Sequence, residues 1–306
     1  MKNLISIVVP SYNESENVVV LADALKKNLK DQQFEIIFVN DGSSDSTLES
    51  IKKLSDTHDF VRYLSFSRNF GHQAALRAGL RSAKGHAVIS MDADMQHPPE
   101  LLPELIKNWK DGYDVVYTVR KDTDKTSLRK RATSRLFYKL LNFLSDLNME
   151  EGAADFRLLD RKIVDIINAQ QETDIFLRGY IHWIGFRQKA IDYVPADRFS
   201  GTSKYTLKKM VGLAGKGVTQ FSVKPLRLSF GLAFIAFALS IFYVVYAVAV
   251  AVSGGAIHGW LSLVTLFVFL QGVQFLLLGL VGEYLGRTFM QTKHRPEYIV
   301  ADSSDA

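Results

Sequence analysis

The feature that most restricts how this chain can fold is the run 228–252, "LSFGLAFIAFALSIFYVVYAVAVAV", which contains no charged side chain. A helix needs about 20 apolar residues to cross the hydrocarbon core of a bilayer, so this run is long enough. A second apolar run, 261–282, includes Gln271 and Gln274, whose amides should face a partner helix rather than lipid. We expect a two-helix transmembrane hairpin; the alternative is a pair of buried helices in a soluble core.

The basic residues around these runs predict their orientation. Lys224 and Arg227 precede the first run, Arg287, Lys293 and Arg295 follow the second, and the connecting loop has neither lysine nor arginine. Positively charged loops stay on the cytoplasmic side. We therefore expect an integral protein of the cytoplasmic membrane with both termini and the large N-terminal domain in the cytoplasm. Glutamines and glycines in the second run would also allow self-association into a homo-oligomer.

The charge and cysteine content limit the partners and the metal chemistry. The 306 residues carry 37 Lys and Arg against 32 Asp and Glu, and no cysteine, which excludes disulfides and thiolate metal sites. Much of the positive charge falls in 125–144 and 203–221. The spacing of their apolar residues predicts amphipathic helices, whose basic side chains would bind anionic lipid headgroups. For 125–144, a solvated basic face on an ordinary packed helix fits equally well. We expect a membrane partner and no nucleic acid.

Strand-like and helix-like segments alternate through the N-terminal part of the chain. The strand-like segments are 4–10, 34–40, 61–66, 86–92 and 113–118, and the helix-like segments are 14–30, 45–57, 70–83 and 98–110. Short apolar runs alternating with helices predict a parallel sheet covered on both faces. In such sheets ligands bind beyond the carboxyl ends of the strands. No G-x-G-x-x-G opens the first helix, which disfavours a dinucleotide site.

The segments that follow the strands are rich in polar side chains, and "MDADMQH" is the most informative of them. Asp92 and Asp94 could simply end a strand at the surface. Along a strand, however, residues i and i+2 project to the same side, so both carboxylates could approach one ion. Oxygen ligands without Cys or His select Mg²⁺ or Mn²⁺. Asp45, directly before "STLESIKKL", is expected to cap the following helix.

Six motifs in order carry a resemblance to a known family: "VVPSYNE", "VNDGSSDST", "SFSRNFGHQAALRAGL", "MDADMQHPPE", "GAADFRLLDR" and "RFSGTSKY". The chain resembles the GT-A fold glycosyltransferases of the family 2 type. Among these it is most similar to the polyisoprenyl-phosphate group, which includes dolichol-phosphate mannose synthases and bactoprenol glucosyltransferases. The resemblance covers residues 4 to about 210, and the two-helix hairpin matches the bacterial membrane-anchored members.

The resemblance implies an α/β fold with a Rossmann-like GT-A catalytic domain at 1–200. We expect three further segments after this domain: a juxtamembrane amphipathic helix at 201–225, two transmembrane helices within 226–286, and a cytoplasmic tail at 287–306. The implied reaction is inverting transfer of a hexose from a nucleotide-diphosphate sugar to a polyisoprenyl phosphate such as undecaprenyl phosphate. We expect UDP-glucose as the donor, with N-acetylglucosamine or a GDP-linked mannose as alternatives.

The family motifs also imply site residues. The nucleotide-sugar site would comprise Pro10, Tyr12, Asn13, Glu14, Asp41 and Asp92. The metal ligands would be Asp92, Asp94 and Gln96. The catalytic residues would be Asp94, Asp155 and Arg198. For Asp155, a salt bridge to Arg157 or a neighbouring cap is the structural alternative.

A lipid phosphate acceptor changes what catalysis requires. A phosphate monoester is already anionic near neutral pH, so its oxygen can attack the sugar without a general base, and it needs positive charge and placement instead. The candidates for the acceptor phosphate are Arg120, Arg135, Arg198, Ser203 and Lys204, with Arg68 behind them. "RFSGTSKY" directly precedes the predicted interfacial helix, where a headgroup would enter.

Two other functions compete with this interpretation. A processive polysaccharide synthase of the same fold would carry a Q-x-x-R-W signature and usually more spans; "RGYIHW" at 178–183 lacks the Gln and the Arg before Trp183. A non-catalytic, membrane-tethered nucleotide-sugar binding scaffold would be favoured by loss of the metal carboxylates, and Asp92 and Asp94 are both present.

Overall fold

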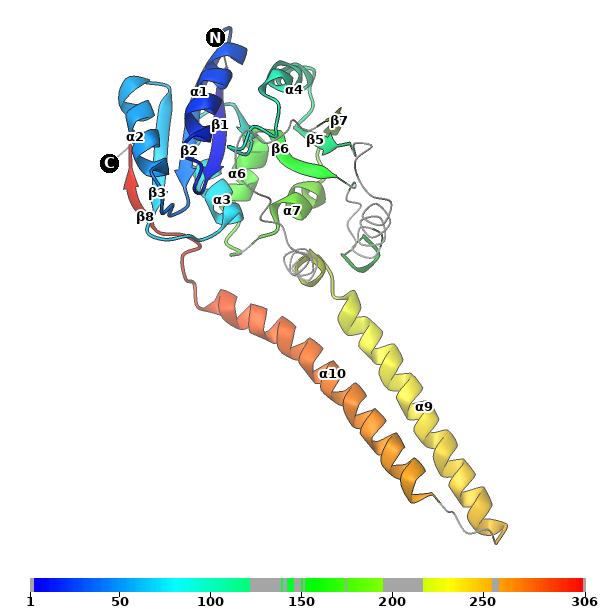
Figure 1. The fold of residues 1–306 in the computed structure, drawn as a ribbon. Coiled ribbons are helices and arrows are strands. Elements are labelled where there is room, and N and C mark those ends of the chain that lie inside the picture. The colour runs from blue at the N-terminus through cyan, green and yellow to red at the C-terminus, as the bar shows by residue number, and fades with distance from the viewer. Residues whose placement is uncertain are drawn as a thin grey trace. The chain divides into compact units, whose positions relative to one another are not determined.

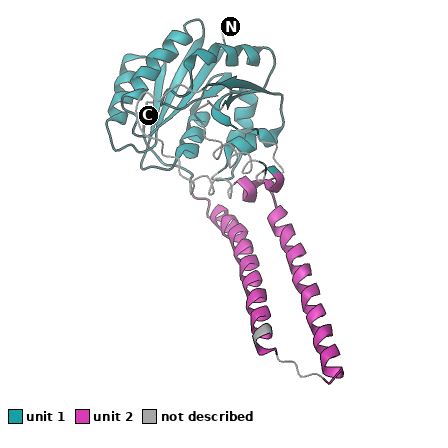
Figure 2. Ribbon diagram, turned by 45° about the vertical axis from the view of Figure 1, so that its right-hand side comes forward, with its two compact units in different colours: residues 1–142, 147–216, 296–306 teal, residues 143–146, 217–295 magenta. Residues whose placement is uncertain are grey.

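The computed structural model describes residues 3–121, 139, 142–145, 150, 152–173, 175–194, 217–254 and 259–304, with the backbone alone for 261–262. The chain divides into two compact units, which Figure 2 draws in different colours. The first unit is Met1–Asn142, Leu147–Lys216 and Pro296–Ala306, and the second is Phe143–Asp146 and Gly217–Arg295. The C-terminal residues therefore belong to the same unit as the N-terminal domain.

The first unit is built on an eight-stranded sheet with the order β7-β5-β6-β4-β1-β2-β3-β8. The strands are β1 (Leu4–Ser11), β2 (Gln33–Asn40), β3 (Val61–Phe66), β4 (Ala87–Ser90), β5 (Val115–Arg120), β6 (Ala153–Asp160), β7 (Gln188–Tyr193) and β8 (Val300–Ser303). β1 is parallel to β2 and β4, β2 to β3, and β5 to β7. β6 is antiparallel to β4 and β5, and β8 is antiparallel to β3. The sheet is therefore mixed.

Helices cover both faces of this sheet (Figure 1). They are α1 (Asn17–Asn28), α2 (Thr47–Thr57), α3 (His72–Ser82), the 3-10 turn η1 (Pro99–Leu101), α4 (Leu102–Lys110), α6 (Arg161–Ala169) and α7 (Leu177–Ile184). α1 contacts α2 on one face, and α3 contacts α6 on the other. In α1 the buried side chains Val18, Leu21, Ala22 and Leu25 recur at helical spacing, so one stripe of the helix faces the sheet.

Close approach of α3 to β1 depends on Gly79. A Cβ at this position would lie 2.1 Å from Cγ1 of Val8, so no side chain fits between the helix and the strand. This contact fixes the height of α3 over the sheet. Its first residue, His72, consequently lies near the carboxyl ends of the central strands, where it bonds with Asp92.

The second unit contains two long helices, α9 (Lys224–Val252) and α10 (Trp260–Thr292). By length and composition both could cross a membrane, and none of the apolar window of either helix is buried. Near the base of the hairpin, Tyr284 Oη donates to the carbonyl of Ser222 at 2.8 Å, and Lys224 Nζ donates to the carbonyl of Phe143 at 2.9 Å. Within the described part of the chain no residue of the apolar windows is buried, so these side chains favour a non-aqueous surrounding.

Four sequence expectations need correction or refinement. The sheet is not all parallel, because the "GAADFRLLDR" motif forms β6 in the antiparallel direction. β4 ends at Ser90, so Asp92 and Asp94 lie in a loop and the strand-alternation argument for them is wrong. α10 extends ten residues beyond 282, to Thr292. Residues 300–303, assigned to a cytoplasmic tail, form β8 of the sheet.

The predicted interfacial helices at 125–144 and 203–221 lie mostly outside the described residues.

Candidate active site

Five strands bring polar residues to one end of the sheet, the end at which the parallel strands β1, β2 and β4 terminate. β1, β2 and β4 are parallel and end there, followed by Tyr12, Asp41 and Asp92. β6 is antiparallel to β4, so its beginning, with Asp155, lies at the same end. β7 is parallel to β5 and ends there at Tyr193. The sequence expectation that these loops converge is thereby confirmed for the described residues.

The loops after β1 and β2 are joined by hydrogen bonds from backbone N–H groups to side-chain oxygens. Asn13 adopts a left-handed backbone with φ of 54°, and its N–H donates to Ser43 Oγ at 3.0 Å. Its side-chain Oδ1 accepts from the N–H of Ser44 at 2.9 Å. The N–H of Glu14 donates to Thr47 Oγ1 at 2.8 Å. The "PSYNE" and "NDGSSD" segments therefore form one rigid surface.

Within this surface, Pro10 lies in β1 opposite Val39 of β2, and Tyr12 is 38 % exposed. Asp45 Oδ1 accepts from both the N–H and the hydroxyl of Thr47, at 3.1 and 2.5 Å. These bonds tie Asp45 to Thr47, the first residue of α2, but the residue at the N-cap position is Ser46, which makes no side-chain cap bond. The capping role expected for Asp45 therefore holds only as a contact with the first turn of the helix.

Asp41 holds the loop that follows β3. It is 3 % exposed, and its Oδ1 accepts from the N–H of Phe70 at 2.7 Å. The N–H of Gly71 donates to Oδ2 at 3.0 Å. Burial raises the pKa of Asp41 above its usual value, and these two backbone donors oppose that rise. A carboxylate has about four acceptor sites, so Asp41 can still accept from a ribose hydroxyl or a base N–H.

Gly42 makes the close packing of these loops possible. Its φ is +65°, and a Cβ there would lie 2.4 Å from the carbonyl carbon of Arg68 and 2.6 Å from the nitrogen of Asn69. The backbone of 68–69 thus packs directly on the turn that carries Asp41. The two loops move as one body because neither can shift without breaking this contact.

Asp92 is fixed by two histidines. Oδ1 of Asp92 lies 2.9 Å from Nε2 of His72, at the first position of α3. The backbone N–H of Asp92 donates to Nδ1 of His97 at 2.9 Å, and Nε2 of His97 lies 3.7 Å from Asp92 Oδ2. His97 is buried and stacks on Phe156 of β6 with ring centroids 5.1 Å apart. His97 is therefore a brace for the 91–97 loop.

Asp92 and His72 shift each other's pKa toward the charged form. Burial alone would raise the pKa of Asp92, but the charge of His97 and the hydrogen bond and charge of His72 lower it to about 2. Burial likewise opposes protonation of His72, and Asp92 outweighs it and raises the pKa of His72 to about 9. Near neutral pH the pair is accordingly a carboxylate and an imidazolium.

Asp94 and Gln96 form the tip of the same loop. The N–H of Gln96 donates to Oδ1 of Asp94 at 3.2 Å, and Met95 between them has a positive φ of 60°. Burial and then the charges of Asp92 and Asp94 raise the pKa of Tyr193 to about 12, against an opposing effect of Arg120. Both carboxylates therefore act on the same side chain at the end of β7.

This donor set suits a divalent cation. The described residues contain no group of three or more His, Cys, Asp and Glu side chains placed to hold a metal ion. Mg²⁺, however, is commonly held by one or two carboxylates together with substrate phosphates and water, and needs no such group. Asp92, Asp94 and the amide oxygen of Gln96 supply only hard oxygen ligands, which fits Mg²⁺ or Mn²⁺.

Asp155 is held by two arginines. Arg178 of α7 grips the carboxylate with both ends of its fork, Nε to Oδ1 at 2.8 Å and Nη2 to Oδ2 at 2.7 Å. Arg157 Nη2 adds a bond to Oδ1 at 3.3 Å. Burial would raise the pKa of Asp155, but Arg178 and then Arg157 hold it well below the usual range. Asp155 is thus a permanent carboxylate with little basicity.

The predicted phosphate-binding residues fall into two groups. Arg120 ends β5 beside Tyr193 in the β5–β7 register and is exposed. Arg68, also exposed, lies over the ring of Phe70 at 3.8 Å from its centroid. Arg135, Arg198, Ser203 and Lys204 lie outside the described residues.

Three residues at this end of the sheet were not singled out from the sequence: His72, Arg178 and Tyr193. His72 occurs inside the quoted "SFSRNFGHQ" motif, so its polarity after a strand was a usable signal. Arg178 lies in "DIFLRGYIHW", where nothing in the local pattern marks it. It meets Asp155, 23 residues away in the sequence, through two hydrogen bonds between α7 and β6, a long-range contact that periodicity does not reveal.

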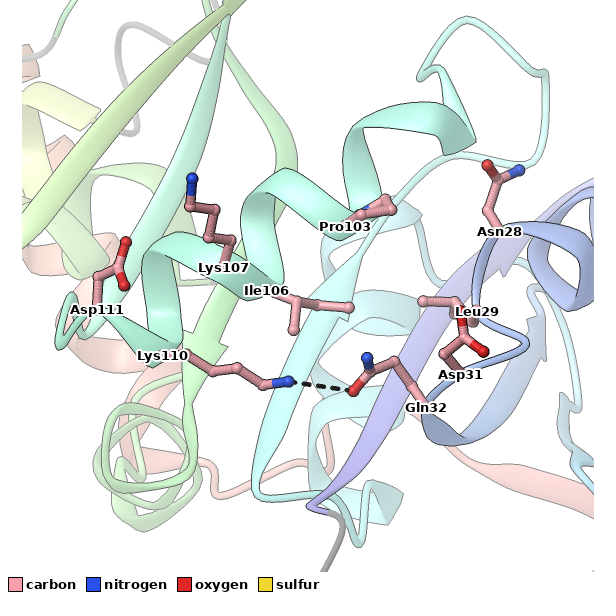
Figure 3. Close-up of a pocket in the computed structure, with 9 residues that line it drawn as sticks. All are labelled: Asn28, Leu29, Asp31, Gln32, Pro103, Ile106, Lys107, Lys110 and Asp111. Carbon is pink, nitrogen blue, oxygen red and sulfur yellow. Dashed lines mark hydrogen bonds between the residues drawn. The ribbon is translucent and has the colours of Figure 1, made fainter.

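A separate groove lies at the other end of the sheet, near the amino end of β2 (Figure 3). It runs between the turn after α1 and helix α4, and Lys110 Nζ and Gln32 Oε1 meet across it at 3.4 Å. β2 begins at Gln33 beside this groove, so the groove is at the amino end of the strand, away from Asp41. Its lysines and aspartates balance in charge, and we assign it no part in the site.

Comparison with known proteins identifies the family. The family described as Glycosyl transferase family 2 matches residues 6–167, which include the end of the sheet described above from β1 to β6. The chain belongs to glycosyl transferase family 2. A further family, the GtrB C-terminal hairpin, matches residues 224–288. With its two uncovered apolar helices, this family 2 glycosyltransferase is a membrane-associated protein.

Curated relatives match over nearly the whole length. The putative glycosyltransferase CsbB of Bacillus subtilis (strain 168) is 41% identical over 306 residues, covering 99% of this chain and 93% of that protein. The bactoprenol glucosyl transferase of Shigella phage SfV is 40% identical over 299 residues, 97% of each chain. The prophage bactoprenol glucosyl transferase homolog of Escherichia coli (strain K12) is 38% identical over 299 residues, covering 97% and 98%.

Among solved structures, the fold of this family 2 chain is similar to glucosyl-3-phosphoglycerate synthase from Mycobacterium tuberculosis in complex with Mn²⁺, UDP and phosphoglyceric acid. The TM-score is 0.50 at 18% identity, covering 71% of this chain and 76% of that one. This likeness supports the GT-A-like α/β fold expected from the sequence motifs.

Proposed function

We propose that this enzyme transfers glucose from UDP-glucose to a polyisoprenyl phosphate such as undecaprenyl phosphate, with inversion at the sugar carbon. The observation that carries the proposal is the full-length match, hairpin included, to proteins named bactoprenol glucosyl transferase at about 40% identity. The product would be a lipid-linked glucose that can serve as a sugar donor in a later transfer reaction.

The donor would bind on the interlocked loops after β1 and β2. Asp41 is placed to accept from the uracil or ribose, and its loop partners hold it in one orientation. The exposed ring of Tyr12 would stack on the base, and Asn13 and Glu14, whose N–H groups bond to the loop after β2, would hold this segment in place. Preorganised acceptors of this kind lower the entropy cost of binding.

Asp92, Asp94 and Gln96 would hold Mg²⁺ or Mn²⁺ with the diphosphate of the donor. The cation neutralises the charge that develops on the departing nucleoside diphosphate. Asp92 contributes as a carboxylate at neutral pH because His72 keeps its pKa low. His97 supports this role by fixing the backbone of the loop.

The acceptor phosphate would attack the anomeric carbon directly. Because the phosphate oxygen is already anionic, no side chain has to remove a proton. Asp155 suits a positioning role, since its lone pairs are engaged by Arg178 and Arg157 and its pKa is depressed. Arg120 at the rim, with Arg135, Arg198, Ser203 and Lys204, would supply the positive charge for the phosphate.

The hairpin would place this chemistry at the cytoplasmic face of the inner membrane. α9 and α10 are long and apolar enough to span it, and the basic residues at both outer ends favour a cytoplasmic location for the catalytic unit. A membrane-resident acceptor is thereby concentrated at the surface to which the enzyme is anchored.

Incubation of the purified protein with UDP-glucose, Mg²⁺ and undecaprenyl phosphate tests the proposal, with products identified by mass. We expect a lipid carrying one hexose, and no product when the lipid phosphate or the cation is omitted. A polymer would indicate a processive synthase instead. Nucleotide-sugar binding without turnover would indicate a scaffold, and turnover with a different donor would reassign the sugar.

A further inference from the structure

The C-terminal residues 297–304 are attached to the edge of the sheet beside the donor loops. β8 pairs with β3 through Leu64 opposite Ser303 and Ser65 opposite Asp302. The N–H of Ser67 donates to the carbonyl of Ile299 at 3.0 Å. Ser67 begins the loop whose end, at Phe70 and Gly71, donates to Asp41. The tail thus touches the same loop that the donor-site aspartate holds.

Aromatic contacts continue from the tail into that loop. The ring of Tyr298 stacks on Phe66 with centroids 5.0 Å apart and an interplanar angle of 13°. Phe66 meets Phe70 edge to face at 5.7 Å and 89°. Phe70 carries the backbone N–H that lies 2.7 Å from Asp41 Oδ1. A row of three aromatic rings in contact, one pair stacked and one edge to face, therefore connects residue 298 to Asp41, the carboxylate expected to bind the nucleoside.

An ion pair connects the tail to the second half of the site. Glu297 Oε2 lies 2.8 Å from Nη1 of Arg77 in α3, and their side chains are only 9% and 2% exposed. Arg77 also donates to the carbonyls of Gln170 and Glu172, so its position is fixed from two sides. α3 begins with His72, which bonds Asp92. The tail accordingly braces both the Asp41 loop and the helix behind the predicted metal carboxylate.

We propose that residues 297–299 are positioning residues for nucleotide-sugar binding. This inference rests on the proposed function for the chemistry of the ligand, a nucleoside diphosphate sugar. The tail does not touch the nucleotide. It limits the freedom of the 67–71 loop, and thereby keeps Asp41 oriented for the base or ribose.

The main variant is Tyr298→Ala, which removes the stack on Phe66. We expect the dissociation constant for UDP, measured by calorimetry without lipid, to rise about 10-fold, and KM for the nucleotide sugar to rise in parallel. The turnover number and KM for the lipid phosphate should change less than about twofold, because a loss confined to donor binding does not alter the later step. Tyr298→Phe keeps the ring and should restore wild-type affinity.

Two controls separate this effect from general loss of stability. Asp302→Asn, in β8, removes the exposed ion pair with Lys52 of α2 and leaves the stack of Tyr298 on Phe66 intact, so UDP affinity should be unchanged. Phe60→Ala removes an aromatic packed on Phe34 and His58 at the opposite end of β3. It should lower the melting temperature by as much as Tyr298→Ala or more, without weakening UDP binding.

The inference is overturned if Tyr298→Ala binds UDP as tightly as the wild type, or if Phe60→Ala weakens binding equally. It is also overturned if Tyr298→Phe fails to restore affinity. The proposed function fails by a different observation, namely the identity of the product. If another nucleotide is the true ligand, the same variants are titrated with that nucleotide, so the two failures remain distinguishable.

Discussion

At the scale of single residues, Asp155 and Asp94 show how one end of a sheet gives two carboxylates different roles. Asp155 is buried and held by Arg178 and Arg157, so its charge is satisfied within the protein. Asp94 lies at the tip of a loop, where its neighbour Asp92 is also negative and both affect Tyr193. The first arrangement suits positioning, and the second suits a cation.

Replacement of Asp94 by Ala should abolish transfer while the protein still folds and inserts. Loss of a metal carboxylate removes several kcal/mol of charge stabilisation from the transition state, so turnover should fall by at least about 100-fold. Asp111→Ala, in the groove at the other end of the sheet, is the control and should keep full activity. Near-normal turnover of the Asp94 variant at saturating Mg²⁺ would contradict the metal assignment.

Asp155→Asn should destabilise the protein in a pH-dependent way. The folded-state pKa of Asp155 is depressed, so its contribution is present above the unfolded value near 3.9 and is lost as pH falls below it. Removing one partner of a buried ion pair costs roughly 3–5 kcal/mol. Melting temperatures of both proteins between pH 7 and pH 3 should show a gap that narrows with acid. A gap independent of pH would contradict this explanation.

At the scale of elements, the site depends on loops that pack directly on one another. The turn after β2 and the loop after β3 touch through backbone atoms at Gly42, where no Cβ fits. The loop after β4 is fixed from the side by His97 stacking on Phe156. These contacts join segments far apart in the chain, so each loop obtains its shape from the others rather than from its own sequence.

Gly42→Ala should weaken nucleotide-sugar binding more than it weakens the fold. The new Cβ would collide with the backbone of Arg68 and displace the loop that donates to Asp41. KM for the donor should rise at least about 10-fold, while a positive φ alone costs about 1–3 kcal/mol of stability. Gly112→Ala is the matched control, because its φ is +93° and its Cβ would meet only Arg187 Nη1 at 3.5 Å. Equal KM changes in both variants would contradict the loop-packing argument.

The sequence predicted most elements that are made by local patterns. The apolar run at 61–66 coincides with β3, and 34–40 differs from β2 by one residue, because buried parallel strands read as short continuous apolar runs. β6 was not predicted, since "GAADFRLLDR" mixes charges into a strand whose buried Asp155 forms ion pairs with Arg157 and with Arg178 of α7. The four-residue β8 is too short and polar to signal a strand, and it exists only because β3 offers an edge.

The candidate site was predictable to a similar degree. Clusters of polar residues after strands located Asp41, Asp92 and Asp94, and the resemblance to the family added Asp155. The side chains that bond with Asp92 and Asp155 and lower their pKa values come from other elements: His72 from the start of α3 and Arg178 from α7. Such pairings follow from packing across the sheet, which a one-dimensional pattern does not contain.

At the scale of the whole molecule, the chain combines an α/β unit with a pair of long apolar helices. We expect the catalytic unit and both termini on one side of the membrane and the α9–α10 loop on the other. The chain has no cysteine, so a single introduced cysteine reports its own location. Lys30 and Ser253 are both exposed and lie in the two regions to be compared.

Lys30→Cys and Ser253→Cys should therefore react with a membrane-impermeant maleimide from opposite sides. In right-side-out vesicles only the cysteine at 253 should be labelled, and in inverted vesicles only the cysteine at 30. Detergent solubilisation should expose both and serves as the control for reactivity. Labelling of both positions from the same side of intact vesicles would contradict the proposed topology.

The C-terminal strand also constrains the order in which the protein can mature. β3 ends at Phe66 and its edge partner β8 begins at Val300, so about 230 residues are synthesised between them. At about 5–20 residues per second the ribosome needs on the order of 10–50 s for that stretch, which includes both apolar helices. The sheet edge beside the donor loops therefore stays open until the hairpin has been made. Until residues 300–303 have been made, the family 2 domain therefore lacks the strand that pairs with β3.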